Sequence, residues 1–225
     1  MTAIAELHKV TKYYGQGKVL IPALREINLT LQAGEFTAMA GPSGSGKTTL
    51  LNIIGGLDRP TEGQVVIEGR EIDHLNDTDL SHLRRDRLGF VFQTYNLIPV
   101  LTALENAEYV LMLQGLPWVE SQRRARQVLK EVGLQGLEQR FPRELSGGQQ
   151  QRVAIARAIA PEPGLVLADE PTANLDSQTG AALLDLMRRL NEEKGVTFLF
   201  STHDPEVMKR ARRLIQLRDG LILQD

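Results

Sequence analysis

The pattern of apolar and polar positions predicts strands near both ends of the chain. Residues 27–31 alternate strictly between apolar and polar side chains, as in an antiparallel strand with one buried face. Residues 13–17 are expected to form the turn before that strand. Asp219 and Gly220 are the expected turn of a closing hairpin over residues 214–224. Further strands are predicted at residues 35–40, 62–69, 88–92, 165–168 and 196–200.

Helical periodicity separates these strands. Thr102 and Glu105 have the Thr-x-x-Glu spacing of a capping box, and Pro117 suits a first helical turn. Asp204, followed by a proline and an acid, marks a later helix start. Other helices are predicted at residues 48–54 and 77–87. Two apolar stripes predict two more helices, the first formed by Ala125, Val128, Leu129 and Val132 and the second by Leu183, Leu186, Met187 and Leu190. Gly195 is expected to end the second of these helices. A chain of 225 residues then fits one α/β domain with an inserted helical subdomain at about 94–160.

Residues 41–48 follow the pattern Gly-x-x-x-x-Gly-Lys-Thr of a phosphate-binding loop. The loop joins a predicted strand to a predicted helix, so glycine N–H groups and the helix N-terminus converge on phosphate oxygens. Lys47 is expected to reach the β- and γ-phosphates, and the Thr48 hydroxyl to take one Mg²⁺ position. The candidate nucleotide-binding residues are Gly41, Pro42, Ser43, Gly44, Ser45, Gly46, Lys47, Thr48 and Thr49. The sequence therefore predicts binding of a nucleoside triphosphate.

Two acids, Asp169 and Glu170, end the apolar run 165–168. Ligands of open α/β sheets lie beyond the carboxyl ends of the strands, so a carboxylate here can hold Mg²⁺ opposite the phosphate loop. One acid completes the metal site, and the adjacent acid can polarise the attacking water. Desolvating two acids at a buried strand end is costly without a cation, which disfavours a plain acidic turn.

A second glycine-rich segment, Leu145–Gln149, precedes an alanine-rich helix. Ser146 and Gln149 have capping-box spacing, and free N–H groups at a helix N-terminus can hold a phosphate. An ordinary helix cap is the alternative. The chain thus carries two phosphate-binding elements but one lysine-bearing loop. A two-fold dimer resolves this, with each nucleotide held between one subunit's loop and the partner's Ser-Gly-Gly cap.

Composition limits the partners, the metal sites and the cellular location that are expected for the chain. The 26 basic and 28 acidic residues nearly balance, so nucleic acid is not expected as a partner. The chain has no cysteine, which excludes disulfides and thiolate metal sites. The N-terminus lacks the features of a signal peptide, and no apolar run approaches the ~18 residues of a membrane span. A soluble, cytosolic chain is expected.

The ordered motifs resemble those of the ATP-binding cassette (ABC) ATPases along essentially the whole chain. Leu145–Gln149 is identical to the signature motif of that family, residues 41–48 resemble its Walker A motif, and residues 165–169 resemble its Walker B motif. The remaining matches are Gln93 for the Q-loop, Ala173–Asp176 for the D-loop, His203 for the switch histidine and Tyr14 for the adenine-stacking aromatic, with Tyr13 as its competitor.

The resemblance implies a P-loop NTPase core with a mixed sheet, an N-terminal antiparallel β subdomain and the helical signature subdomain, in a single domain over 1–225. The core and β subdomain would take about 1–93 and 161–225. Glu170, His203, Gln93 and Lys47 would be catalytic, and Thr48, Gln93 and Asp169 would hold Mg²⁺. ATP would also contact Tyr14, Asp176 and the partner's Ser146, Gly147, Gly148 and Gln149.

Within the family, residues 93–99 and the 145–160 block look like the lipoprotein-release and macrolide-export type. That type implies an ATP-sandwich homodimer and an integral-membrane permease with a large extracytoplasmic domain. The subunit would then lie peripherally on the cytoplasmic side of the inner membrane. ATP hydrolysis would power export, lipoprotein release or mechanical work.

Two alternatives come from other classes. A DNA-maintenance ATPase of the same superfamily would insert long coiled coils between the Q-loop and the signature, whereas residues 94–144 show no sustained heptads. A translation regulator would carry two cassettes in one chain. Basic clusters at 84–87, 123–126 and 209–213 read as solvated helix faces or as contacts with an anionic membrane surface.

Overall fold

The computed structural model describes residues 2–16 and 19–225 and contains two sheets. The first is antiparallel, with strand order β2-β1-β4-β5. Its strands are β1 (Ala3–Gln16), β2 (Val19–Gln32), β4 (Glu62–Ile67) and β5 (Arg70–Glu71). Ile27, Leu29 and Leu31 are buried while Asn28 and Thr30 are exposed, as the alternation predicts. The predicted antiparallel β subdomain is confirmed.

The predicted turn at residues 13–17 is wrong. Residues 13–16 belong to β1, and Gly17 lies outside the described residues. Tyr13 pairs with Pro22 and Tyr14 with Ile21, so the strand continues because a long partner strand satisfies its backbone.

The second sheet has the order β10-β9-β3-β8-β7-β6. Its strands are β3 (Phe36–Ala40), β6 (Leu88–Val91), β7 (Leu165–Ala168), β8 (Thr197–Thr202), β9 (Arg213–Arg218) and β10 (Leu221–Gln224). All neighbours are parallel except β9 and β10, which form the predicted hairpin. The predicted mixed sheet is therefore confirmed, and the carboxyl ends of its parallel strands share one edge.

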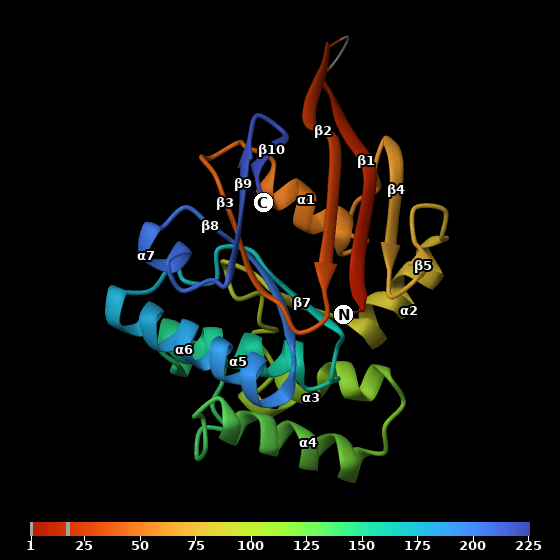
Figure 1. The fold of residues 1–225 in the computed structure, drawn as a ribbon. Helices are drawn as coiled ribbons and strands as arrows, with labels where there is room; N and C mark the ends of the chain where they lie inside the picture. Colours follow the sequence, from red (N-terminus) through yellow and green to blue (C-terminus); the bar gives the residue numbers. More distant parts are fainter. Residues whose placement is uncertain (1, 17–18) are drawn as a thin grey trace.

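Helices cover both faces of this sheet (Figure 1). They are α1 (Lys47–Ile54), α2 (Asp77–Arg87), α3 (Ala103–Leu113), α4 (Trp118–Glu131), the 3₁₀ helix η1 (Pro142–Glu144), α5 (Gly147–Ile159), α6 (Ser177–Lys194) and α7 (Pro205–Met208). Helix α1 lies between the two sheets, and its buried Leu50 and Ile53 join one apolar core with Leu7 and Met39. The second core packs α3 to α6 against the other face of the larger sheet.

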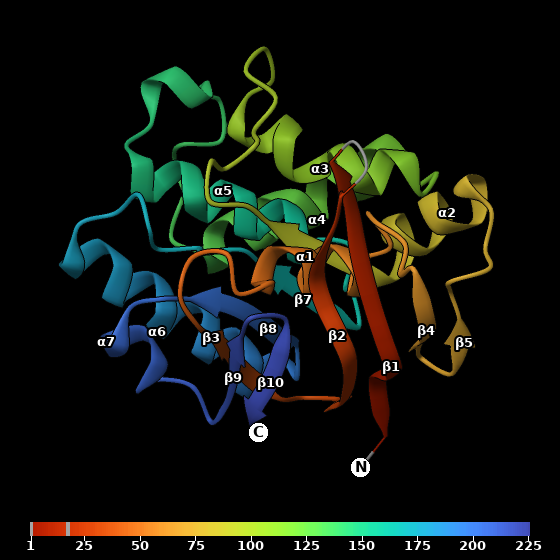
Figure 2. The same cartoon turned by 90° about the horizontal axis from the view of Figure 1, so that it is seen from above.

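Helix ends follow the local sequence signals. Thr102 and Glu105 form the expected capping box at the start of α3, and Gly195 ends α6 in the left-handed conformation. Pro117 immediately precedes α4 instead of standing in its first turn. Helices α3, α4 and α5 all fall within the predicted insert at 94–160 and lie together in Figure 2, while the subdomain boundaries stay a prediction.

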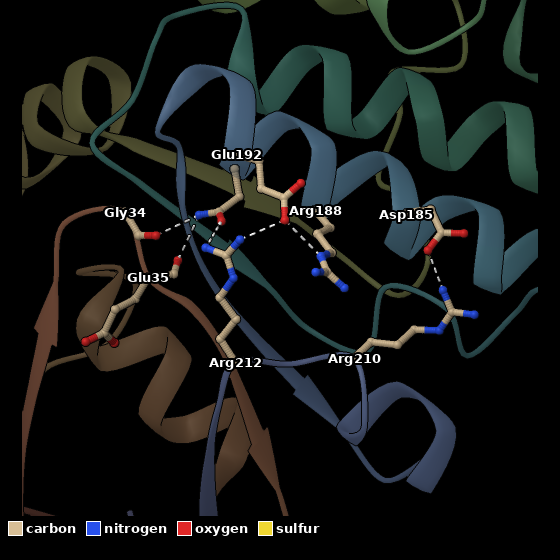
Figure 3. A network of polar contacts seen from close by, with 8 residues as sticks. Gly34, Glu35, Asp185, Arg188, Glu192, Arg210 and Arg212 are labelled. Carbon is tan, nitrogen blue, oxygen red and sulfur yellow. Dashed lines mark hydrogen bonds and ion pairs between the residues drawn. The ribbon is translucent and has the colours of Figure 1, made fainter.

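A polar network joins α6 to the residues just before β3 and to the segment between α7 and β9 (Figure 3). Asn191 donates to the carbonyl oxygens of Gly34 and Val196 at 2.9 and 2.8 Å. Arg212 binds Glu192 at 2.7 Å, and Arg210 is ion-paired with Asp185. Helix α6 is thereby held to the residues that precede β3 and β8 and to the segment that follows α7. None of the described helices is long and apolar enough to cross a membrane.

Candidate nucleotide-binding site

The phosphate loop leaves the carboxyl end of β3, a fully buried strand in the interior of the larger sheet, and enters α1. Two of its positions admit only glycine. A Cβ on Gly41 would lie 2.0 Å from the carbonyl oxygen of Leu217. Gly46 has φ +105°, and a Cβ there would lie 2.7 Å from the carbonyl oxygen of Ala23. The loop is thus pressed against β9 and β2, which fixes its shape.

Lys47 folds over this loop. Its Nζ donates to the carbonyl oxygens of Gly41 at 2.7 Å and Pro42 at 3.0 Å, and the residue is only 6% exposed. The Ser45 hydroxyl is buried and has no hydrogen-bond partner among the described residues. An ammonium and an unpaired hydroxyl under an exposed glycine turn suit an anion such as a triphosphate.

Thr48 and Asp169 meet at the first turn of α1. The Thr48 hydroxyl donates to Asp169 Oδ2 at 2.9 Å, so a strand-end carboxylate and a loop hydroxyl stand side by side. Mg²⁺ takes oxygen ligands and keeps several waters or phosphate oxygens, so a hydroxyl and a carboxylate side by side suit it as ligands. No cluster of three acids or histidines suited to a metal occurs within residues 2–16 and 19–225.

Glu170 and His203 also lie together. His203 Nδ1 is 2.9 Å from Glu170 Oε1, and Glu170 has φ +45°, in the left-handed region that non-glycine residues seldom occupy. The Glu170 N–H donates to the Ser201 hydroxyl at 2.9 Å, which helps to hold that backbone. The strained position aims a carboxylate at the carboxyl edge of the sheet, where water can reach it.

Ser201 is a site residue that the sequence does not reveal. Its hydroxyl donates to Asp169 Oδ1 at 2.5 Å and accepts from Glu170, so one side chain holds both acids. The predicted strand ends at Phe200, whereas β8 runs to Thr202. The available signal is the polar Ser-Thr-His sequence that follows the apolar run.

Tyr14 of β1 lies beside Asp58, in the segment that follows α1. Its hydroxyl donates to Asp58 Oδ2 at 2.7 Å, and Lys12 Nζ is 5.0 Å from the centroid of its ring. Burial, followed by the Asp58 hydrogen bond, raises the pKa of Tyr14. The residue is 42% exposed. Its stacking role stays a prediction.

Gln93 lies just beyond β6 and is exposed. Its carbonyl oxygen accepts from Asn174 Nδ2 at 2.9 Å. No hydrogen bond joins its side chain to Thr48 or Asp169 in the part of the chain that the structure describes. The expected contact of Gln93 with Mg²⁺ and water stays a prediction.

The segment Ser146–Gln149 forms the expected capping box at the start of α5. Ser146 is exposed, and no hydrogen bond links the segment to residues 41–48 among the described residues. Asp176 caps α6 by accepting from the N–H groups of Gln178 and Thr179, and the bonds from Thr179 lower the pKa of Asp176. The helix cap that the sequence predicts is therefore formed, and its phosphate-binding role stays a prediction.

Comparison with known proteins identifies relatives along the whole chain. The sequence model of the family described as ABC transporter matches residues 24–173. An uncharacterized ABC transporter ATP-binding protein of Methanocaldococcus jannaschii is 49% identical, covering 96% of this chain and 93% of the relative. The lipoprotein-releasing system ATP-binding protein LolD of Anaeromyxobacter dehalogenans is 47% identical, covering 100% of this chain and 94% of the relative. The macrolide export ATP-binding/permease protein MacB of Marinobacter nauticus is 45% identical, covering 99% of this chain but 34% of that longer protein.

A solved structure shares the fold. The dimeric post-hydrolysis state of the ATP-binding cassette MJ0796, bound to ADP and Pi, superposes with a TM-score of 0.91 at 48% identity. The match covers 98% of this chain and 97% of the other. These comparisons confirm the predicted family resemblance and fold class. They support the transport reading and not the DNA-maintenance or translation alternatives.

Proposed function

This chain belongs to the ABC transporter family, and from that premise we propose that it is the ATP-hydrolysing subunit of a membrane transporter. The observation that carries the proposal is the cluster at the carboxyl edge of the sheet. Lys47 lies over the phosphate loop, Thr48 meets Asp169, and His203 meets Glu170. Phosphoryl transfer depends mostly on positioning and charge stabilisation, which such a cluster supplies.

Each residue has a step of its own. Lys47 neutralises charge on the γ-phosphate, and the loop N–H groups hold the phosphate chain. Glu170 orients the attacking water and accepts its proton at a carboxylate oxygen. His203 contacts the γ-phosphate and keeps Glu170 in place through Nδ1. Thr48, Asp169 and Gln93 would hold Mg²⁺, which supplies charge neutralisation on the phosphates when bound.

Hydrolysis takes place between two copies of the chain. Ser146–Gln149 stand apart from the loop of their own subunit, so a partner copy is the source of the cap that completes each site. Asp176 lies at the start of α6 and can reach across the same interface. The dimeric state of the related cassette supports this arrangement.

The expected membrane partner is a permease with a large extracytoplasmic domain. The likeness to LolD and MacB supports this subtype and a place on the cytoplasmic side of the inner membrane. Dimer closure would then drive extrusion, lipoprotein release or mechanical work. Co-purification with a permease encoded nearby tests this point, and ATP-dependent retention on DNA or ribosomes would contradict it.

Glu170→Gln tests the catalytic assignment. The amide keeps the shape but cannot accept the proton, so turnover should fall by roughly 10²–10⁴-fold while ATP-bound dimers accumulate. Steady-state phosphate release and size-exclusion chromatography with ATP measure the two effects. Near-normal turnover would remove Glu170 from the role.

Mixing two inactive variants tests the shared site. A dimer of Lys47→Ala and Ser146→Ala subunits contains one composite site with both residues intact and one with neither. Equal mixing should restore activity to about a quarter of wild type, because half of the dimers are mixed and half of their sites are complete. No recovery would show that each chain hydrolyses ATP alone.

A further inference from the structure

We propose that Arg157 and Tyr95 fasten the Gln93 loop, defined as residues 92–102 between β6 and α3, to helix α5, and that this contact couples the two ATP sites of the dimer. The inference rests on the proposed function, because only in the sandwich dimer do the two ends of the contact serve different sites. Gln93 would act at its own subunit's site, whereas Ser146–Gln149 at the start of α5 would act at the partner's site.

The backbone of the Gln93 loop needs support from outside. Tyr95 has φ +62° and Asn96 has φ +48°, so two successive non-glycine residues adopt the left-handed conformation. Arg157 of α5 supplies that support. Its Nη1 donates to the Asn96 carbonyl oxygen at 2.5 Å and its Nη2 to the Tyr95 carbonyl oxygen at 3.0 Å. One planar guanidinium thus binds the two carbonyls of the strained segment.

Arg157 has no ion-pair partner among the described residues, and burial lowers its pKa. An arginine placed only to cover apolar surface would extend its charged end into water. Here the charged end is turned inward onto two carbonyl groups. The side chain is therefore placed to hold the loop.

The Tyr95 hydroxyl lies close to the start of the same helix. A Cβ built on Gly147, the first residue of α5, would lie 2.8 Å from that hydroxyl oxygen but 3.8 Å from the ring carbon that bears it. Gly147 and Arg157 are ten residues apart, about 15 Å along a helix. The loop thus runs along α5 from Arg157 to the start of the helix, where the glycine of the signature segment makes room for a loop hydroxyl.

Two amide side chains extend the contact to the catalytic strand end. Asn174 Nδ2 donates to the Gln93 carbonyl oxygen at 2.9 Å. Gln151 of α5, which is fully buried, donates to the carbonyl oxygen of Pro171, the residue after Glu170, at 2.7 Å. A displacement of the start of α5 by the partner's nucleotide would therefore move the loop that carries Gln93. Because the α5 helix of each subunit would contact the nucleotide of the other, binding of a nucleotide at one site would change the position of Gln93 at the second site.

Arg157→Met tests the support of the loop in the full-length protein, with Arg152→Met as the matched control. Arg152 lies on the same helix and also donates to a carbonyl oxygen, that of Val132, but does not touch the Gln93 loop. Arg157→Met should lower kcat by about tenfold or more and leave KM for ATP within about twofold. Arg157→Lys should recover part of the loss, and hydrogen exchange at amides 94–98 should accelerate only in Arg157→Met. Equal kcat in Arg157→Met and Arg152→Met would overturn the inference.

The proximity of Tyr95 to Gly147 offers a second test, which can be carried out even if the Arg157→Met variant folds poorly. Gly147→Ala places a methyl group against the Tyr95 hydroxyl and should cost about tenfold or more in kcat. Tyr95→Phe removes that hydroxyl, so the double variant should recover at least about fivefold of the loss. Smaller recovery would show that Gly147 serves only the phosphate, and would overturn the coupling. Wild-type protein without ATPase activity would contradict the proposed function itself, which separates the two failures.

Discussion

Ser201 offers a test of how Asp169, the proposed Mg²⁺ ligand, and Glu170, the proposed base, are held. The side chain is fully buried, donates to Asp169 Oδ1 at 2.5 Å and accepts the N–H of Glu170 at 2.9 Å. Ser201→Ala removes one atom and keeps the strand. It deprives Asp169 of a charge-assisted hydrogen bond and leaves the Glu170 N–H without its partner.

The magnitude follows from those two bonds. A hydrogen bond to a charged group contributes about 1.5–3 kcal/mol, and a buried unpaired N–H costs about 1–3 kcal/mol. Because the two costs overlap at one atom, the free energy of unfolding should fall by about 2–4 kcal/mol. Without the hydrogen bond from Ser201, the Asp169 carboxylate is also less firmly held in the orientation in which it accepts from Thr48. At 1.36 kcal/mol for each factor of ten, kcat should fall by about 10- to 150-fold.

Urea unfolding and steady-state phosphate release at saturating ATP measure the two effects. Thr202→Val is the control, because the neighbouring Thr202 hydroxyl accepts only the N–H of Asp204, at 3.0 Å, and touches neither acid. It should lose about 1 kcal/mol of stability and keep kcat within about threefold. If folded Ser201→Ala retains kcat within about twofold, the hydroxyl does not position the acids and the reasoning is refuted.

Two further predictions concern the residues beside α1. Stacking on a base contributes about 1–3 kcal/mol, so Tyr14→Ala should raise the Kd for ATP, measured by calorimetry, about 5- to 150-fold. The control variant Tyr13→Ala should change the Kd by less than about twofold. Equal effects of the two substitutions would contradict the choice of Tyr14 as the stacking residue. Burial alone would raise the pKa of Asp58, but hydrogen bonds from Lys12 and Tyr14 outweigh it and hold the pKa below its usual value. Since the folded pKa lies below the unfolded one, Asp58 stabilises the fold above about pH 4 and loses that effect as the pH falls through the folded pKa. Urea titrations of wild type and Asp58→Asn should differ by about 1 kcal/mol at pH 7 and converge in acid, and a constant difference would contradict the assignment.

Elements that depend on local signals could be predicted from the sequence. The bounds of α2 at 77–87 and of β7 at 165–168 match their predicted ranges, because caps, charges and apolar runs lie within the element itself. The turn predicted at residues 13–17 is wrong for the opposite reason. Adjacent tyrosines and glycines resemble a turn, yet pairing with β2 extends the strand. That pairing is a property of another segment, which local patterns do not contain.

The residues of the site also differ in whether a local sequence pattern or the tertiary structure determines their role. The phosphate loop could be predicted because the motif that defines it consists of consecutive residues. Ser201 could not, since its role comes from the register of two parallel strands. Ala168 of β7 pairs with Phe200 of β8, so the next residues, Asp169 and Ser201, lie side by side where both strands end. The tertiary register, and not the serine itself, makes that hydroxyl a partner of the acids.

The geometry of Lys47 separates ATP binding from hydrolysis. An ammonium has three N–H donors, and two of them already bind the carbonyl oxygens of Gly41 and Pro42. The third can meet a phosphate oxygen without breaking either bond, so one chain is ready to bind ATP. Under the proposed function, Ser146–Gln149 act at the partner's site, so each site closes only when a second copy supplies them. ATP binding should therefore persist in subunits too dilute to dimerise, whereas the hydrolysis rate of dilute subunits should rise with the square of the protein concentration. A rate that stays proportional to concentration under dilution would show that one chain closes its own site.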